Sequence, residues 1–102
     1  MDSLIWLQKW FAKQCDGDWE HSYGISIETL DNPGWRVKIS LQNIDVEQKD
    51  IVILNSERNE SDWIHCKIAY DKELDGIYFW GYGGIENLGE ILDSFRRWVD
   101  CR

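Results

Sequence analysis

The stretch YGISIETLDNPGWRVKISLQ, residues 23–42, decides the fold. Apolar and polar side chains alternate along residues 23–29 and again along residues 35–42, as in strands with one buried face. The turn sequence DNPG, residues 31–34, separates these segments. Directly paired residues share a face, so only a loop with an odd number of residues places Ile27 opposite Ile39. We therefore predict a hairpin with a loop of three or five residues and with Gly34 at positive φ.

Three further strand segments follow this hairpin. Trp63–Tyr70 alternates again, and Ile77–Tyr82 is rich in aromatic residues. Ile51–Leu54 is a short apolar run, which predicts a strand covered on both faces. No helical pattern interrupts these segments, so the predicted sheet has five strands and is mostly antiparallel.

One amphipathic helix is predicted at each end of the chain. The first, residues 4–15, follows Asp2 or Ser3, either of which can cap it, and ends near Gly17, which suits a left-handed conformation. Its predicted apolar stripe consists of Leu4, Leu7, Phe11 and Cys15. The second keeps a helical period through Leu88, Ile91, Leu92, Phe95, Trp98 and Val99. The predicted fold class is α+β, in the order α-β-β-β-β-β-α, with the N-terminal and C-terminal helices packed on one face of the sheet and the other face partly open.

Composition and charge exclude several classes of protein. The 102 residues, 43% of them hydrophobic, suffice for a core, and we expect residues 1–102 to form one domain. The formal net charge of −8 disfavours direct binding to nucleic acid and favours a basic protein partner. Uncharged runs are too short to span a membrane, and the first residues lack the basic region of a secretion signal, so we expect a cytoplasmic protein. The three cysteines are expected as reduced thiols, with no metal and no cofactor.

Residues 15–24 contain a thiol, carboxylates and an imidazole, which are groups that active sites use. Cys15 is predicted at the C-terminus of a helix, before two aspartates, and this setting opposes the thiolate that a nucleophile requires. Glu20 and His21 are candidates for a general acid–base pair. The alternative, which we favour, is that one of them hydrogen-bonds nearby backbone and fixes the loop that enters the first strand. We therefore predict no catalytic residues.

Aromatic residues beside carboxylates instead indicate a protein-binding surface. Of the seven tryptophans, Trp10 and Trp98 can fill the helix–sheet core, whereas the others are less easily all buried, and we expect at least one at the surface. The first candidate surface consists of Asp16, Asp18, Trp19, Glu20, His21, Tyr23, Glu28, Asp31 and Trp35. The second consists of Asp71, Glu73, Asp75, Glu86, Glu90 and Asp93.

Four segments carry a resemblance to a known family. Residues 4–11, 15–25, 28–35 and 79–88 resemble the immunity protein 53 family of bacterial polymorphic toxin systems. The resemblance implies a small cytoplasmic α+β protein, encoded beside a toxin that it binds and neutralises. The matching motif residues are either structural or toxin-facing: Trp19, Glu20, His21, Tyr23, Asp31, Asn32, Pro33, Gly34 and Trp35.

The sequence thus predicts an immunity protein that blocks the C-terminal domain of a cognate toxin by stoichiometric occlusion. A nuclease fits as the target, because its cleft is basic in order to hold phosphates. Two alternatives stay open: a small acid–base enzyme that uses Glu20 and His21 with Asp31, and a generic adaptor for another basic protein.

Overall fold

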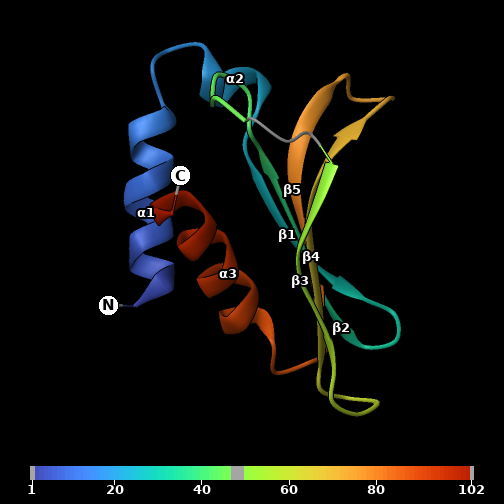
Figure 1. Ribbon diagram of the computed structural model, residues 1–102. Coiled ribbons are helices and arrows are strands. Elements are labelled where there is room, and N and C mark those ends of the chain that lie inside the picture. Colours follow the sequence, from blue (N-terminus) through green and yellow to red (C-terminus); the bar gives the residue numbers. More distant parts are fainter. Residues whose placement is uncertain (1, 47–49, 102) are drawn as a thin grey trace.

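The computed structural model describes residues 2–46 and 50–101. Figure 1 shows a single sheet with both long helices on one side of it. The elements are α1 (Ser3–Gln14), α2 (Trp19–Ser22), β1 (Ile25–Leu30), β2 (Gly34–Ser40), β3 (Asp50–Glu57), β4 (Trp63–Asp71), β5 (Gly76–Gly83) and α3 (Leu88–Asp100). This arrangement confirms the predicted α+β fold.

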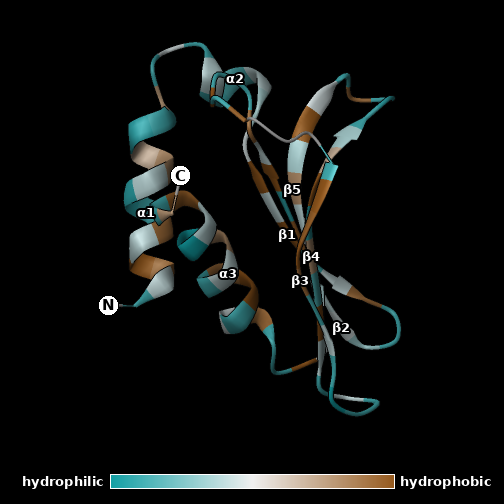
Figure 2. Ribbon diagram, viewed as in Figure 1, coloured by the Kyte–Doolittle hydropathy of each residue, from teal (hydrophilic) through white to brown (hydrophobic). Residues whose placement is uncertain are grey.

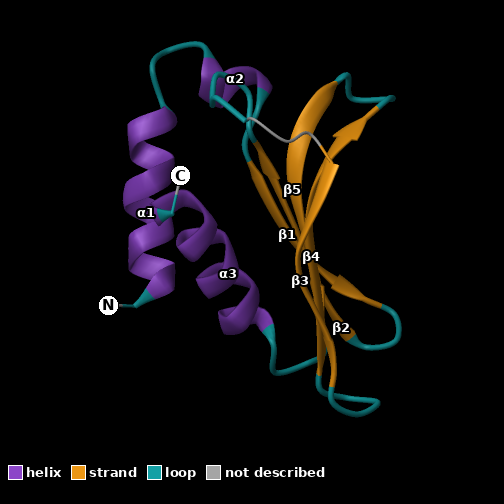
Figure 3. Ribbon diagram, viewed as in Figure 1, coloured by secondary structure: helices purple, strands orange, loops and turns teal. Residues whose placement is uncertain are grey.

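The sheet has the strand order β1-β2-β5-β4-β3, and every neighbouring pair is antiparallel. The last strand in the chain therefore lies at the centre, between two hairpins. On the helical side, α3 lies against the strands and α1 packs mainly on α3 (Figure 3). The two helices thus form successive layers on the same side of the sheet.

The β1–β2 hairpin confirms the odd loop but corrects its register. Three residues, 31–33, form the turn, and Ile27 lies opposite Val37 where we predicted Ile39. Gly34 is the first residue of β2, and its φ is not positive. A Cβ atom at Gly34 would lie 2.4 Å from the carbonyl oxygen of Gly83 in the neighbouring strand. Close approach of two backbones, and not a left-handed turn, is therefore what requires glycine here.

The predicted stripe of α1 is wrong by about one position. Leu4, Phe11 and Cys15 are exposed, whereas Leu7 and Trp10 are buried. The reason is aromatic packing, because the Trp10 ring meets a phenylalanine ring of α3 edge-on, with 5.0 Å between the centroids. The helix begins and ends one residue earlier than the predicted 4–15, but the groups predicted at its ends are present. The Asp2 carboxylate accepts the backbone N–H of the first turn at 2.9 Å, and the glycine after the helix has φ +96°.

Phe95 joins the layers of the core. It is fully buried, and its ring centroid lies 5.0 Å from those of Trp10 in α1 and Phe79 in β5. Figure 2 shows that the turns at both ends of the sheet are mainly hydrophilic. The apolar contacts are thus concentrated between the strands and α3, where they exclude water from the largest area.

The prediction that β3 is covered on both faces is wrong. It is an edge strand, Val52 is 66% exposed, and the strand continues beyond the apolar run to Glu57. The physical reason is topological, since β5 takes the central position that a short apolar run would suit. Among the described residues, no helix is long and apolar enough to cross a membrane.

Candidate functional site

The carboxylates before and within α2 are bound to backbone. Asp16 accepts the N–H groups of Asp18 and Trp19, each at 2.9 Å. Glu20 accepts those of Asp16 and Gly17, each at 2.9 Å. This confirms that Glu20 hydrogen-bonds nearby backbone, but the loop that it fixes joins α1 to α2 and does not lead directly into β1.

The electrostatics of this loop oppose acid–base and thiol chemistry. Backbone N–H groups, first its own and then those of Asp16 and Gly17, hold the pKa of the Glu20 carboxyl below its usual range. Such a carboxyl is a poor proton donor at neutral pH. Desolvation raises the pKa of the Cys15 thiol, and the charges of Glu20 and Asp16 add to this effect.

Trp19 belongs to the core. It is only 2% exposed, and its indole N–H donates to the backbone carbonyl of Gln42 at 3.1 Å. The ring lies edge-on to Trp10, with 6.2 Å between the centroids. Trp19 is therefore not part of a binding surface, although its neighbour Tyr23 remains 38% exposed.

The rest of the first candidate surface divides between two ends of the sheet. Asp18 and His21 are exposed beside the start of β1, whereas Asp31 is exposed in the turn after it. The six residues of β1 separate these groups by about 20 Å. Trp35 lies near the turn and is half-buried, and its indole N–H donates to the carbonyl of Ile85 at 2.7 Å. Residues of this surface that lie close together in the sequence are thus far apart in the structure.

The second candidate surface divides in the same way. Asp71 accepts backbone N–H groups of its own turn, between β4 and β5, and Asp75 accepts the hydroxyl of Tyr70 at 2.5 Å. Glu73 is exposed in that turn. The β4–β5 turn lies at the α2 end of the sheet, whereas Glu86 lies at the opposite end, which holds the β1–β2 turn and the start of α3.

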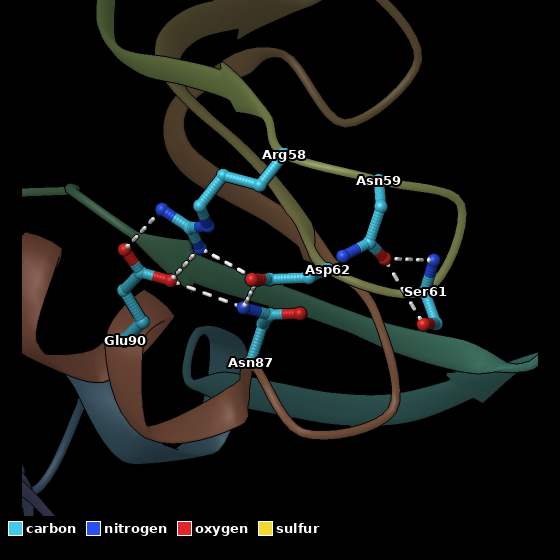
Figure 4. Close-up of polar contacts among 6 residues, drawn as sticks. All are labelled: Arg58, Asn59, Ser61, Asp62, Asn87 and Glu90. Carbon is cyan, nitrogen blue, oxygen red and sulfur yellow. Dashed lines mark hydrogen bonds and ion pairs between the residues drawn. The ribbon is translucent and has the colours of Figure 1, made fainter.

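A polar network fixes this opposite end (Figure 4). Arg58, after β3, bonds the carboxylates of Asp62 at 2.8 Å and Glu90 at 2.7 Å. The side-chain amide of Asn87 donates to the same two carboxylates, at 2.9 and 3.1 Å. Hydrogen bonds, first from Arg58, lower the pKa of both acids. Glu90 therefore ties the β3–β4 turn to α3, and the Asp93 carboxylate likewise accepts the hydroxyl of the buried Ser3.

The sheet face opposite the helices is covered by no described element, and we call it the open face. Its side chains follow from strand alternation, since residues next to the buried Val37, Phe79 and Ile68 point away from the core. On the three inner strands they are mainly aromatic or basic: Arg36, Lys38, Trp63, His65, Lys67, Tyr78, Trp80 and Tyr82. The edge strands β1 and β3 add Glu28 and Glu57 to this face. Trp63 and Trp80 are only partly buried, which agrees with the expected surface tryptophan.

The register places these side chains in rows across the strands. Lys38, Trp80 and Lys67 face one another on β2, β5 and β4. The next row contains Arg36, Tyr82 and His65. Sequence alternation assigns each residue to a face, but the rows depend on β5 lying between β4, which precedes it, and β2, which is far from it in the chain. The candidate surfaces predicted from acidic residues accordingly missed most of the open face, although Glu28 of the first surface lies on it, opposite Arg36.

A hollow of about 340 Å³ lies on the open face, beside the irregularity in β3 between Val52 and Leu54. Its lining includes Val52, Asn55, Trp63, His65, Lys67 and Tyr82. The rings of Trp63 and His65 are 5.5 Å apart, and His65 Nε2 lies 3.1 Å from a carboxylate oxygen of Glu57. The volume is at the lower limit of ligand pockets, and a single protein side chain suits it better than a large ligand.

The fold and this face define a class: a small α+β domain with one helical side and one uncovered aromatic face of its sheet. The chain belongs to the immunity protein 53 family, whose sequence model matches residues 4–100. Neither the curated proteins nor the solved structures gave a match.

Proposed function

We propose that this protein is an immunity protein that binds the toxin domain encoded beside it and neutralises it by stoichiometric occlusion. Family membership supports a toxin as the partner. The observation that carries the proposal is the open face, which offers partly buried aromatic side chains of the kind that anchor interfaces. Occlusion requires such a surface and needs no turnover.

The exposed carboxylates at both ends of the sheet supply the long-range part of recognition. Asp18, Asp31, Glu73 and Glu86 are exposed, and in the described part of the chain they form no ion pair. With a net charge of −8, they accelerate the approach of a basic domain. A cytoplasmic nuclease toxin of a polymorphic system fits this description, because its cleft is basic.

Co-expression with the toxin domain tests the proposal. Cells that produce this protein should survive, and the two chains should co-elute as a complex of constant stoichiometry. The double variant Glu20→Ala with His21→Ala separates occlusion from catalysis. Occlusion predicts that a folded double variant still binds and still protects. Retained binding with loss of protection would favour the acid–base enzyme, and failure of the wild-type protein to protect would refute the proposal.

A further inference from the structure

The central row of the open face places two lysines on either side of a tryptophan. Lys38 and Lys67 are each directly opposite Trp80 in the register of β5 with its two neighbours. Adjacent strands are about 4.8 Å apart, so the two lysine backbones are about 10 Å apart. Lys38 Nζ also lies 5.6 Å from the centroid of the Tyr78 ring, which orients it over the face.

In the described part of the chain these lysines have no close ion-pair partner, although the charge of Lys38 contributes, after Arg36, to the lowered pKa of the Glu28 carboxyl. Neither Lys38 nor Lys67 forms an ion pair there, whereas Arg36 in the next row is paired with Glu28 at 2.8 Å. Two lysines without a close carboxylate at the centre of a face contrast with a chain of net charge −8. Exposed acids lie in the turns at the two ends of the sheet described above, and Glu28 and Glu57 lie on the two edge strands, where they contact Arg36 and His65.

We propose that the open face, centred on Trp80, is the contact surface for the toxin domain, and that the segment it binds carries carboxylates beside an apolar side chain. This inference rests on the proposed function. The carboxylates lie between the ammonium groups of Lys38 and Lys67, against the indole of Trp80. The apolar side chain occupies the hollow between Val52 and Trp63.

Charge complementarity favours a protein segment over a nucleic acid on this face. An aromatic sheet with lysines can stack the bases of a single strand, but a polyanion must extend past the ends of the platform. Here both ends carry exposed carboxylates, among them Asp18 and Asp31, which repel phosphates. A short acidic segment within an otherwise basic domain matches all three zones, negative, positive and negative, and this pattern fixes the position of the segment along the strands.

The test uses an inactivated toxin domain from the neighbouring gene as the probe in a kinetic binding assay. The double variant Lys38→Glu with Lys67→Glu reverses the central charges. Lys9→Glu with Lys13→Glu, on exposed positions of α1, changes the net charge equally and serves as the matched control. We expect the first variant to raise the Kd about tenfold or more and the control to change it less than about twofold. Trp80→Ala, checked for folding by circular dichroism, should also weaken the complex.

Each outcome decides the inference. Equal affinities of the wild type and the Lys38/Lys67 variant, or tighter binding by that variant, would overturn it while the complex itself upholds the proposed function. A wild-type protein that forms no complex would overturn both. A fluorescein-labelled oligouridine is the second probe. Tight oligouridine binding that the Lys38/Lys67 variant loses, with unchanged toxin binding, would assign the face to single-stranded RNA and refute a protein contact.

Discussion

Replacement of two leucines in α1 tests which side of that helix packs on the core. Leu7 is 5% exposed and Leu4 is 51% exposed, although the sequence pattern placed both on one apolar stripe. Leu→Ala removes three carbon atoms, each worth about 0.8 kcal/mol when buried. For Leu7 this gives about 2 kcal/mol, and the cavity left against α3 brings the loss of unfolding free energy to about 3 kcal/mol.

The same change at Leu4 should cost about 1 kcal/mol or less, because half of that side chain already contacts water and no cavity forms. The assay is urea unfolding followed by tryptophan fluorescence, with the slope m compared between variants. Both losses are measurable against a domain stability of about 5–15 kcal/mol. Equal losses at the two positions would refute the observed packing and restore the stripe predicted from the sequence.

Three further outcomes follow from the structure. Gly34→Ala should lower the unfolding free energy by about 1–3 kcal/mol, because a Cβ atom there meets backbone at 2.4 Å, while Gly24→Ala, with open space around it, should be nearly neutral in the same urea assay. Arg58→Gln should destabilise the chain at pH 7. Hydrogen bonds, first from Arg58, hold the pKa of Glu90 below its ordinary 4.5, so that stabilisation is complete above this value and is lost as the pH falls through the folded-state pKa. The unfolding free energies of the wild type and of the Arg58→Gln variant should therefore converge in acid. A difference that persists there would contradict hydrogen bonding from Arg58 to Glu90 as its cause. Cys66 is buried, with its pKa raised by desolvation to about 11, so Ellman's reagent should modify the two exposed thiols of the native chain and reach the third only in denaturant. Rapid modification of all three would show that the core opens.

The elements of this fold were largely predictable because most of them carry strong periodicity. The alternation in residues 35–42 and the helical period from Leu88 onwards each leave one interpretation, and the observed elements agree. In α1 the pattern was ambiguous, since tryptophans at 6 and 10 lie beside the leucine stripe and both stripes are apolar. Only the aromatic rings of α3 decide which stripe packs. The four residues of α2 are too few to show any period.

The candidate site was less predictable, because a binding surface depends on contacts between distant residues. Five acids between Cys15 and Trp35 suggested one negative patch, but a whole strand separates Asp18 from Asp31. Several predicted contact residues, among them Glu20, serve the fold through local hydrogen bonds. The lysines and tryptophans of the open face come from three separate segments. The sequence of each segment does not show which strands will be its neighbours in the sheet.

The central position of β5 has a consequence during synthesis on the ribosome. Until residues 76–83 are available, the chain holds two hairpin segments that share no hydrogen bonds, and α3 has no complete sheet to cover. Incomplete copies should accordingly remain unfolded and be degraded. Under the proposed function, protection would then begin only after both β5 and α3 have been translated.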